Sequence, residues 1–255
     1  MVFSADCFKL AELKPIKPIK TIKLKFMRSA LPIMAIMAFT LPQFCIGQFS
    51  KIEVEEVDNS GLISGATYRV YAVMEDSLDR LDAVMPFEGH PIVIHSSSKF
   101  YQHPNGAPIA TEIRRVDVEN DLALAYDSWV TIDLSDNYLN RAAVHPPGSK
   151  FLDNFENSGE SIVSYVEDPN GGAWFVRPDE AQGIAGTDKK VLIAQFTTAG
   201  TVTGLINLMG RKTTGDAALP NDAHKGLIKE EGIMFTCPAN VRGLTREDLL
   251  QLSPR

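Results

Sequence analysis

Cysteine is rare in this sequence, and its placement excludes a disulfide framework. Cys7 and Cys45 lie within the first 47 residues, so Cys237 is the one cysteine of the remaining chain. A domain of about 200 residues buries most of its unfolded surface and folds without a disulfide or a structural metal. Cys237 follows the apolar pair Met234-Phe235 closely, and a lone cysteine there is more often a small buried hydrophobe than a nucleophile. We therefore expect Cys237 to lie in the core.

Basic residues are scarce after position 47. The whole chain has 25 Lys and Arg against 32 Asp and Glu, of which seven basic and two acidic residues fall at positions 1–47. The remainder holds 18 basic and 30 acidic residues, a net charge of −12. A protein that binds nucleic acid needs a basic face for the phosphates, so we expect no nucleic-acid partner. An acidic surface suits a soluble secreted protein or one that meets cations.

A long hydrophobic run is also missing, and the short one near the N-terminus is typical of a signal peptide. Residues 31–44 are mainly apolar but contain two prolines, and a membrane-spanning helix needs about 20 apolar residues. A lysine- and arginine-containing flank precedes this run, and small residues precede Gln48. We predict an exported protein, secreted or at the cell surface, that is cleaved near Gly47-Gln48. Its start is Met1 or Met27.

Catalytic signatures are absent from the sequence as well. It contains no Gly-x-Ser-x-Gly, no His-Glu-x-x-His and no Walker loop. Carboxylate pairs for glycoside hydrolysis are recognised in space rather than along the chain, so a secreted glycan-directed hydrolase stays open as an alternative. The leading hypothesis is a secreted non-catalytic module that binds a ligand, a glycan or a component of the surface or matrix.

Short apolar runs between turn-forming clusters are what the sequence has in abundance. Nine segments are rich in β-branched and aromatic residues or alternate between apolar and polar positions: 51–57, 66–74, 79–85, 91–95, 128–134, 161–166, 173–176, 191–198 and 201–209. Helical periodicity is convincing only at residues 246–252, where Thr245 is the expected N-cap and Asp248 completes a capping box. Many short strands predict an all-β fold, an antiparallel β-sandwich or jelly roll, with a short C-terminal helix.

The domain organisation follows from these elements. We assign residues 1–47 to an N-terminal extension with the signal peptide, residues 48–240 to the β-sandwich domain and residues 241–255 to a C-terminal tail. Within the domain, residues 191–198 and 201–209 are both β-rich and are joined by an Ala-Gly pair. This arrangement predicts a β-hairpin.

For two tryptophans and one aspartate, the sequence predicts a role in the fold. Trp129 and Trp174 lie inside apolar segments, and a tryptophan there packs in the core more often than it stacks on a sugar ring. Asp127 stands at the entry to the segment 128–134. Because a short carboxylate bonds nearby backbone amides, we expect a structural role for Asp127.

Acidic and amide residues crowd the predicted loops. Asp76, Asp79 and Asp82 recur at three-residue spacing, and hard oxygen ligands in loops are what calcium needs. We take these three aspartates as candidate metal ligands and a calcium-stabilised structural module as a further hypothesis. No acidic group matches the twelve-residue calcium loop, and Asp and Asn also form turns without any metal.

Several segments occur in a characteristic order. They are Tyr68-Arg69-Val70-Tyr71-Ala72, Asp79-Arg80-Leu81, Phe100-Tyr101-Gln102, Ala125-Tyr126-Asp127-Ser128-Trp129-Val130-Thr131-Ile132 and Ala194-Gln195-Phe196-Thr197-Thr198. This order resembles an uncharacterised family of secreted bacterial all-β domains. The resemblance covers about residues 66–209. It implies an exported all-β domain with no assigned activity, and it carries no catalytic residue over to this chain.

Overall fold

The computed structural model describes residues 49–178, 180–212 and 226–252. The predicted signal peptide, its cleavage site at Gln48 and the cysteines Cys7 and Cys45 lie outside these residues. The chain divides into two units, Met1–Phe44 and Cys45–Arg255, and all described residues belong to the second. Within the described ranges, no helix combines the length and the apolar character needed to cross a membrane.

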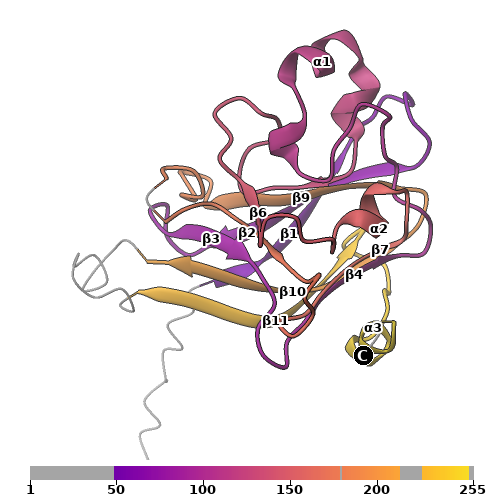
Figure 1. Ribbon diagram of the computed structural model, residues 1–255. Helices are drawn as coiled ribbons and strands as arrows, with labels where there is room; N and C mark the ends of the chain where they lie inside the picture. The colour runs from indigo at the N-terminus through magenta and orange to yellow at the C-terminus, as the bar shows by residue number, and fades with distance from the viewer. Residues whose placement is uncertain (1–48, 179, 213–225, 253–255) are drawn as a thin grey trace, which may run out of the picture. The chain divides into compact units, whose positions relative to one another are not determined.

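Eleven strands of the described residues form two antiparallel sheets, which lie one above the other in Figure 1. Sheet A has the order β1 (Phe49–Val57), β2 (Ala66–Met74), β9 (Lys190–Thr198) and β5 (Trp129–Val130). Sheet B runs β6 (Ala143–His145), β8 (Ala173–Phe175), β3 (Arg80–Val84), β10 (Val202–Arg211), β4 (Ile92–Ser96) and β7 (Ser161–Ser164), with β11 (Leu227–Cys237) paired to β10. The predicted all-β sandwich is therefore confirmed.

Five short helical segments complete the described fold. They are η1 (Ala110–Glu112), α1 (Arg115–Asn120), η2 (Leu122–Tyr126), α2 (Asp153–Glu156) and α3 (Arg246–Gln251). In α3, Thr245 and Asp248 form the predicted capping box, in which each side chain accepts from the other residue's backbone N–H.

The main core lies between the two sheets because alternate residues of each strand point inward. In β2, Tyr68, Val70, Ala72 and Met74 are buried while the residues between them are half-buried. Aromatic side chains bridge the layers. Phe196 of β9 stacks on Phe235 of β11 with ring centroids 6.4 Å apart. Burying each such side chain contributes about 1.5–3 kcal/mol relative to leaving it exposed.

Two smaller apolar clusters cover the outer faces of the sheets. On sheet A, Trp129 and Leu192 pack with Ile113 and Leu124 from the region of η1, α1 and η2, which lies above sheet A in Figure 1. On sheet B, Leu249 of α3 packs against Val93 and Leu205. The segment assigned to a C-terminal tail therefore contributes a helix that covers part of sheet B.

The core predictions for single side chains are confirmed. Trp129 is 2% exposed and Trp174 is fully buried. The Trp174 indole N–H donates to the backbone oxygen of Ile193 at 3.1 Å, which satisfies its polar atom inside the core. Cys237 is a free thiol in the main core. Burial in this apolar setting raises the pKa of the Cys237 thiol strongly, so it is protonated and unreactive at neutral pH.

The predicted hairpin of residues 191–198 and 201–209 is wrong. β9 pairs with β2 and β5 in sheet A, whereas β10 pairs with β11, β3 and β4 in sheet B. Both edges of each strand are therefore occupied by other partners. The Ala-Gly pair carries the chain from one sheet to the other, and Gly200 N–H donates to Thr198 Oγ1 at this crossing, at 3.0 Å.

The predicted strand at residues 128–134 is much shorter in the structure. Only Trp129–Val130 forms regular pairs, with Gln195 and Ala194 of β9. Asp133 has a φ of 73°, a left-handed conformation that interrupts a strand. The alternation still has a structural meaning, because Val130 belongs to the main core and Trp129 to the cluster on the outer face of sheet A.

Candidate functional site

Three charged side chains form an ion triad on the outer face of sheet B. Arg80 and Asp82 belong to β3 and are two residues apart, a spacing that favours one face of a strand. Arg211 of β10 is the cross-strand partner of Arg80. Arg80 Nε lies 2.7 Å from Asp82 Oδ1, and Arg211 Nε lies 3.1 Å from Asp82 Oδ2. Both carboxylate oxygens therefore face a guanidinium group.

The triad is held in place by burial and by backbone contacts. The side chains of Arg80 and Asp82 are 9% and 3% exposed, and that of Arg211 is 40% exposed. Burial raises the pKa of the Asp82 carboxyl, while Arg80 and then Arg211 lower it. The Nη2 atom of Arg80 also donates to the backbone oxygen of Arg177 at 3.1 Å. A buried carboxylate is tolerated because its charge and lone pairs are matched in this way.

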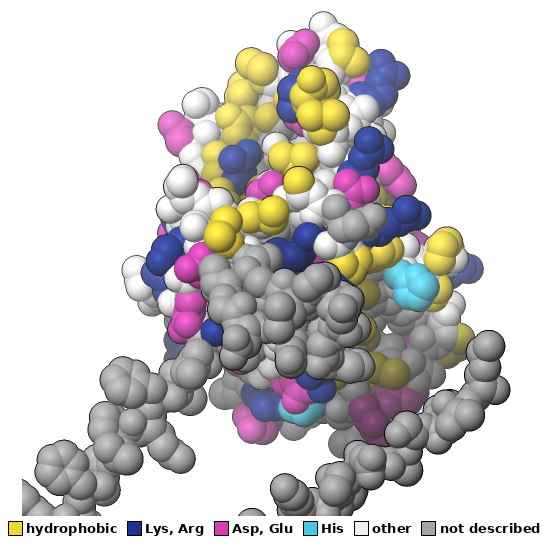
Figure 2. Space-filling model, turned by 90° about the vertical axis from the view of Figure 1, so that its left-hand side faces the viewer, with side chains coloured by type: hydrophobic (Ala, Val, Ile, Leu, Met, Phe, Trp, Pro, Cys, Tyr) yellow, Lys and Arg dark blue, Asp and Glu magenta, His cyan; other side chains and the backbone are white. Residues whose placement is uncertain are grey.

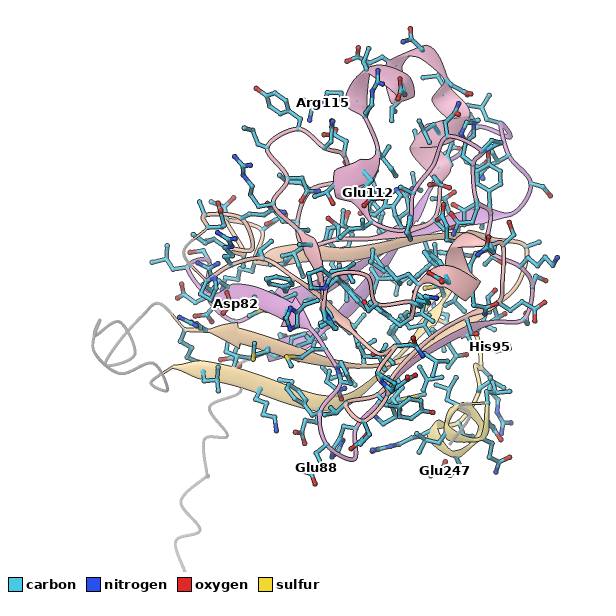
Figure 3. All side chains as sticks on the ribbon, in the orientation of Figure 1. Asp82, Glu88, His95, Glu112, Arg115 and Glu247 are labelled. Carbon is cyan, nitrogen blue, oxygen red and sulfur yellow. The ribbon has the colours of Figure 1, made fainter. Side chains whose placement is uncertain are left out.

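An apolar hollow of about 300 Å³ lies beside the triad. It opens among β3, β6, β8 and β10, near the position where Figure 3 labels Asp82. Its lining is almost entirely apolar: Ala83, Met85, Ala173, Phe175, Val176, Pro178 and Met209, with Asp82 and His145 as the polar members. A concave apolar lining with a few fixed polar groups is the usual form of a small-molecule site.

A second hollow of about 380 Å³ adjoins the first, and Phe175 lines both. Its other lining residues are Arg141, Ala143, Arg177 and Glu180. The backbone is fixed on both sides, because Arg141 N–H donates to Gln182 Oε1 at 2.6 Å and the Arg177 carbonyl accepts from Arg80. Figure 2 shows the side of the molecule that lies to the left in Figure 1, where hydrophobic, basic and acidic side chains are intermixed on the described surface.

A third hollow of about 480 Å³ lies elsewhere on sheet B, near His95 in Figure 3. Its lining is polar and includes His95, Lys99, Asn154 and Glu160. Asn154 Nδ2 is already bound to Ser161 Oγ at 2.9 Å. No Phe, Tyr or Trp side chain lines this hollow, so it lacks the large aromatic surface on which a sugar ring stacks.

The three predicted metal ligands lie close in sequence but have different partners. Asp76 Oδ1 accepts from the Leu78 N–H at 2.9 Å, and Asp79 Oδ2 accepts from the Asp76 N–H at 3.2 Å, so both aspartates shape a turn. Asp82 belongs to the ion triad. Among the residues that the structure describes, no group of three or more His, Cys, Asp or Glu side chains is arranged to hold a metal. The calcium site stays a prediction.

Two carboxyl groups elsewhere titrate near neutral pH. Burial raises the pKa of Asp127 to about 7, although the N–H groups of His103 and Ala107 donate to its oxygens at 2.7 and 3.0 Å and lower the pKa. These contacts confirm its expected bonding to backbone amides. Burial, and then the charge of Glu112, raise the pKa of Glu156 to about 7. Asp127 is fully buried, so it has no surface with which to touch a substrate.

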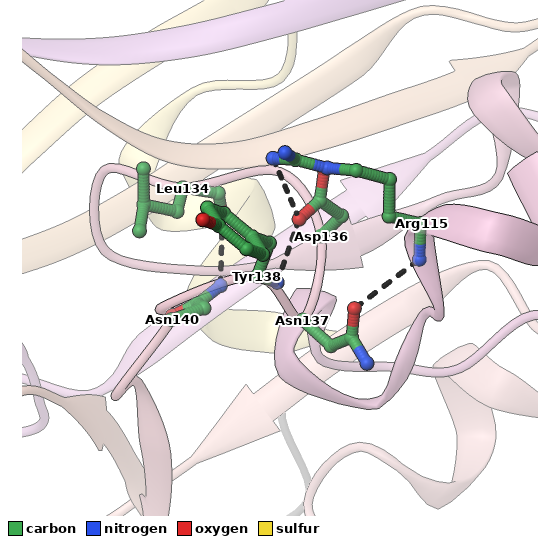
Figure 4. A network of polar contacts seen from close by, with 6 residues as sticks. All are labelled: Arg115, Leu134, Asp136, Asn137, Tyr138 and Asn140. Atoms are coloured by element: carbon green, nitrogen blue, oxygen red, sulfur yellow. Dashed lines mark hydrogen bonds and ion pairs between the residues drawn. The ribbon is translucent and has the colours of Figure 1, made fainter.

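One exposed loop is held rigidly by polar contacts (Figure 4). Arg115 binds both oxygens of Asp136, at 2.9 and 3.2 Å, and its guanidinium lies 4.4 Å from the centre of the Tyr138 ring. Asn137 Oδ1 accepts from the Arg115 N–H. Leu139, with a φ of 58°, is 67% exposed at the tip. The loop is a prearranged surface feature, but no hollow is associated with it among those described above.

No protein-family model, no curated protein and no solved structure matches this chain. The function therefore has to be argued from the site itself. The spacing of the acidic residues indicated Asp82 as a candidate metal ligand, whereas no pattern in the sequence indicated Phe175, Arg141 or Arg177. The spacing of Arg80 and Asp82 was a usable signal for a charged pair on one strand face. The arginines of the second hollow had no local signal, because β6 and β8 bring them together only in the folded sheet.

Proposed function

We propose that this chain is an exported, non-catalytic β-sandwich that binds a ligand in the apolar hollow on the outer face of sheet B. The observation that carries the proposal is an apolar concavity whose wall holds an ion triad of two arginines that share one aspartate. Buried arginine and aspartate side chains on rigid strands keep such a site formed without its ligand, which lowers the cost of binding. The volume of about 300 Å³ is at the small end of ligand sites.

The methionines of the chain provide a direct test. Met85 and Met209 line the hollow, whereas Met234 lies on β11 outside this lining and is 37% exposed. We would label the methionine methyl groups with ¹³C and titrate the protein with decanol, an uncharged apolar probe. Saturable shifts at Met85 and Met209, with Met234 unmoved, are the expected result. Equal small shifts at all three methyl groups would show non-specific association and remove the proposal.

A substitution that fills the hollow provides a second test, and the same substitution at an exposed position is its matched control. Ala173 lies in the hollow and is 8% exposed, so Ala173→Leu is expected to occupy the space and abolish decanol binding. Ala239→Leu adds the same side chain at an exposed position and should leave binding unchanged. Thermal unfolding of both variants checks that the fold is kept. Unaltered decanol binding in the folded Ala173→Leu protein would place the ligand elsewhere.

A secreted glycan-directed hydrolase is the second candidate, and one observation favours it. Glu156 has a pKa near 7, as a general acid working at neutral pH requires. Turnover of a glycan by the purified protein that is lost in Glu156→Gln and kept in Glu160→Gln would establish this candidate in place of a non-catalytic module. Absence of turnover across a panel of glycans, esters and peptides is what the binding proposal expects.

A further inference from the structure

We infer that the ligand is an amphipathic anion, with its apolar chain in the apolar hollow and its acid group between Arg141 and Arg177. This inference rests on the proposed function and names the chemical class that the site takes.

The two arginines lie at the same end of one strand pair. β6 and β8 are antiparallel, with Ala143 paired to Phe175. Arg141 precedes β6 by two residues and Arg177 follows β8 by two residues, so both lie at the same end of this pair. Both line the second hollow and both are exposed. Like charges that line one hollow repel each other, so a bound anion between them would relieve this repulsion.

Neither arginine is neutralised by a carboxylate of the described residues. Arg80 and Arg211 share Asp82, and Arg114 and Arg115 pair with Asp117 and Asp136. No corresponding ion pair is found for Arg141 or Arg177 in the part of the chain that the structure describes, although Glu180 lines the same hollow. In a body with a net charge of −12, two arginines that line one hollow without an ion pair form a local positive site that attracts an anion.

Phe175 connects the second hollow, which contains the two arginines, to the apolar hollow. Its side chain lines both, on the same face of β8 as Ala173. A ligand that fills both hollows therefore needs an apolar chain with an acid group attached directly to its end. Guanidinium groups bind carboxylate, sulfate and phosphate oxygens through paired N–H donors. A small inorganic anion would bind only to the arginines, and a neutral hydrocarbon would pack only against the apolar lining.

A series of ten-carbon probes separates these contributions. We would measure the dissociation constants of decanoate, decanol and decyltrimethylammonium by calorimetry, with the Met85 and Met209 methyl shifts as a check on the location. Decanoate is expected to bind about 10-fold or more tightly than decanol, because hydrogen bonds to charged groups are stronger than neutral ones. Octanoate should bind more weakly than decanoate by about fourfold for each methylene removed.

Variants assign the charge effect to residues. Arg141→Gln with Arg177→Gln should reduce decanoate affinity to that of decanol and leave decanol affinity unchanged. Glu180→Gln should strengthen decanoate binding only, because it removes a like charge from the same hollow. Arg114→Gln removes an exposed arginine on the side of sheet A that carries α1 and should change neither affinity.

The outcomes distinguish this inference from the function on which it rests. Equal affinities for decanoate, decanol and decyltrimethylammonium at Met85 and Met209 would overturn the anionic ligand and keep the apolar site. Decanoate binding that survives the double arginine variant would also overturn it. If none of the probes shifts Met85 and Met209, the proposed function fails, and the inference fails with it.

Discussion

At the scale of single residues, two acidic groups make stability depend on pH in the same direction. The pKa values of Asp127 and Glu156, both about 7 in the folded protein, lie above the values of about 3.9 and 4.3 in an unfolded chain. Between these limits the folded state retains protons that the unfolded state has released. The contribution of these groups to stability is therefore complete below about pH 4, is lost as the pH rises, and is gone above about pH 7.

Glu156→Gln is expected to flatten this dependence. Glu156 Oε2 is buried without a hydrogen-bond partner among the described residues, and so is Gln102 Oε1. An uncharged amide at position 156 avoids burying a charge at high pH. The urea midpoint of Glu156→Gln should therefore exceed that of the parent protein at pH 8 and approach it at pH 5. Glu160→Gln changes an exposed neighbour and is the control. An unchanged dependence of stability on pH in Glu156→Gln would show that Glu156 does not cause it.

The ion triad predicts that truncating one side chain lowers the stability of the protein strongly. Asp82→Ala leaves the guanidinium of Arg80 buried without its carboxylate, and breaking a buried pair in this way costs about 3–5 kcal/mol. Asp117→Ala removes the acid of an exposed ion pair with Arg114, and such pairs are worth about 0–1 kcal/mol. Chemical denaturation of both variants measures the difference. Similar losses for the two would show that the triad is solvated rather than buried.

At the scale of elements, α3 depends on one side chain for its attachment. Leu249 is fully buried against Val93 and Leu205, whereas the adjacent Leu250 is 37% exposed. Leu249→Ala should cost about 2–5 kcal/mol in the stability of the docked helix. Hydrogen exchange of the α3 amides would report the loss as faster exchange, and Leu250→Ala serves as the matched control. Equal exchange in the two variants would mean that other contacts attach the helix, such as the hydrogen bond from the Leu244 N–H to Thr203 Oγ1 of β10.

The crossing between β9 and β10 shows why this element pair was mispredicted. A β-rich segment, a short turn and another β-rich segment are common to a hairpin and to a connection between two sheets. The difference lies in the partners, since β9 is flanked by β2 and β5 and β10 by β11, β3 and β4. Those partners come from distant parts of the chain, so local composition does not contain the distinction.

At the scale of the whole molecule, calcium dependence is the remaining prediction to test. Calcium at 100 times its dissociation constant would stabilise the protein by about 2.7 kcal/mol, and each kcal/mol moves the unfolding midpoint by roughly 2–4 °C in a domain of this size. Thermal unfolding curves in excess calcium and in EDTA measure this effect, and a shift of several degrees would support Asp76, Asp79 and Asp82 as ligands. Coincident curves would remove the calcium site, and guanidinium groups facing both oxygens of Asp82 would be the physical reason.

The sequence by itself determined the fold class, most strand positions, the capping box of α3 and the burial of Trp129, Trp174 and Cys237. These features depend on residues that are neighbours along the chain, through alternation, turn formers and side-chain hydrophobicity. The tertiary structure alone decided which sheet each strand joins, how Arg211 reaches Asp82 and how Arg141 and Arg177 come to line the same hollow. Those contacts exist only when distant strands pair, because a cross-strand neighbour is defined by register and leaves no local pattern in the sequence.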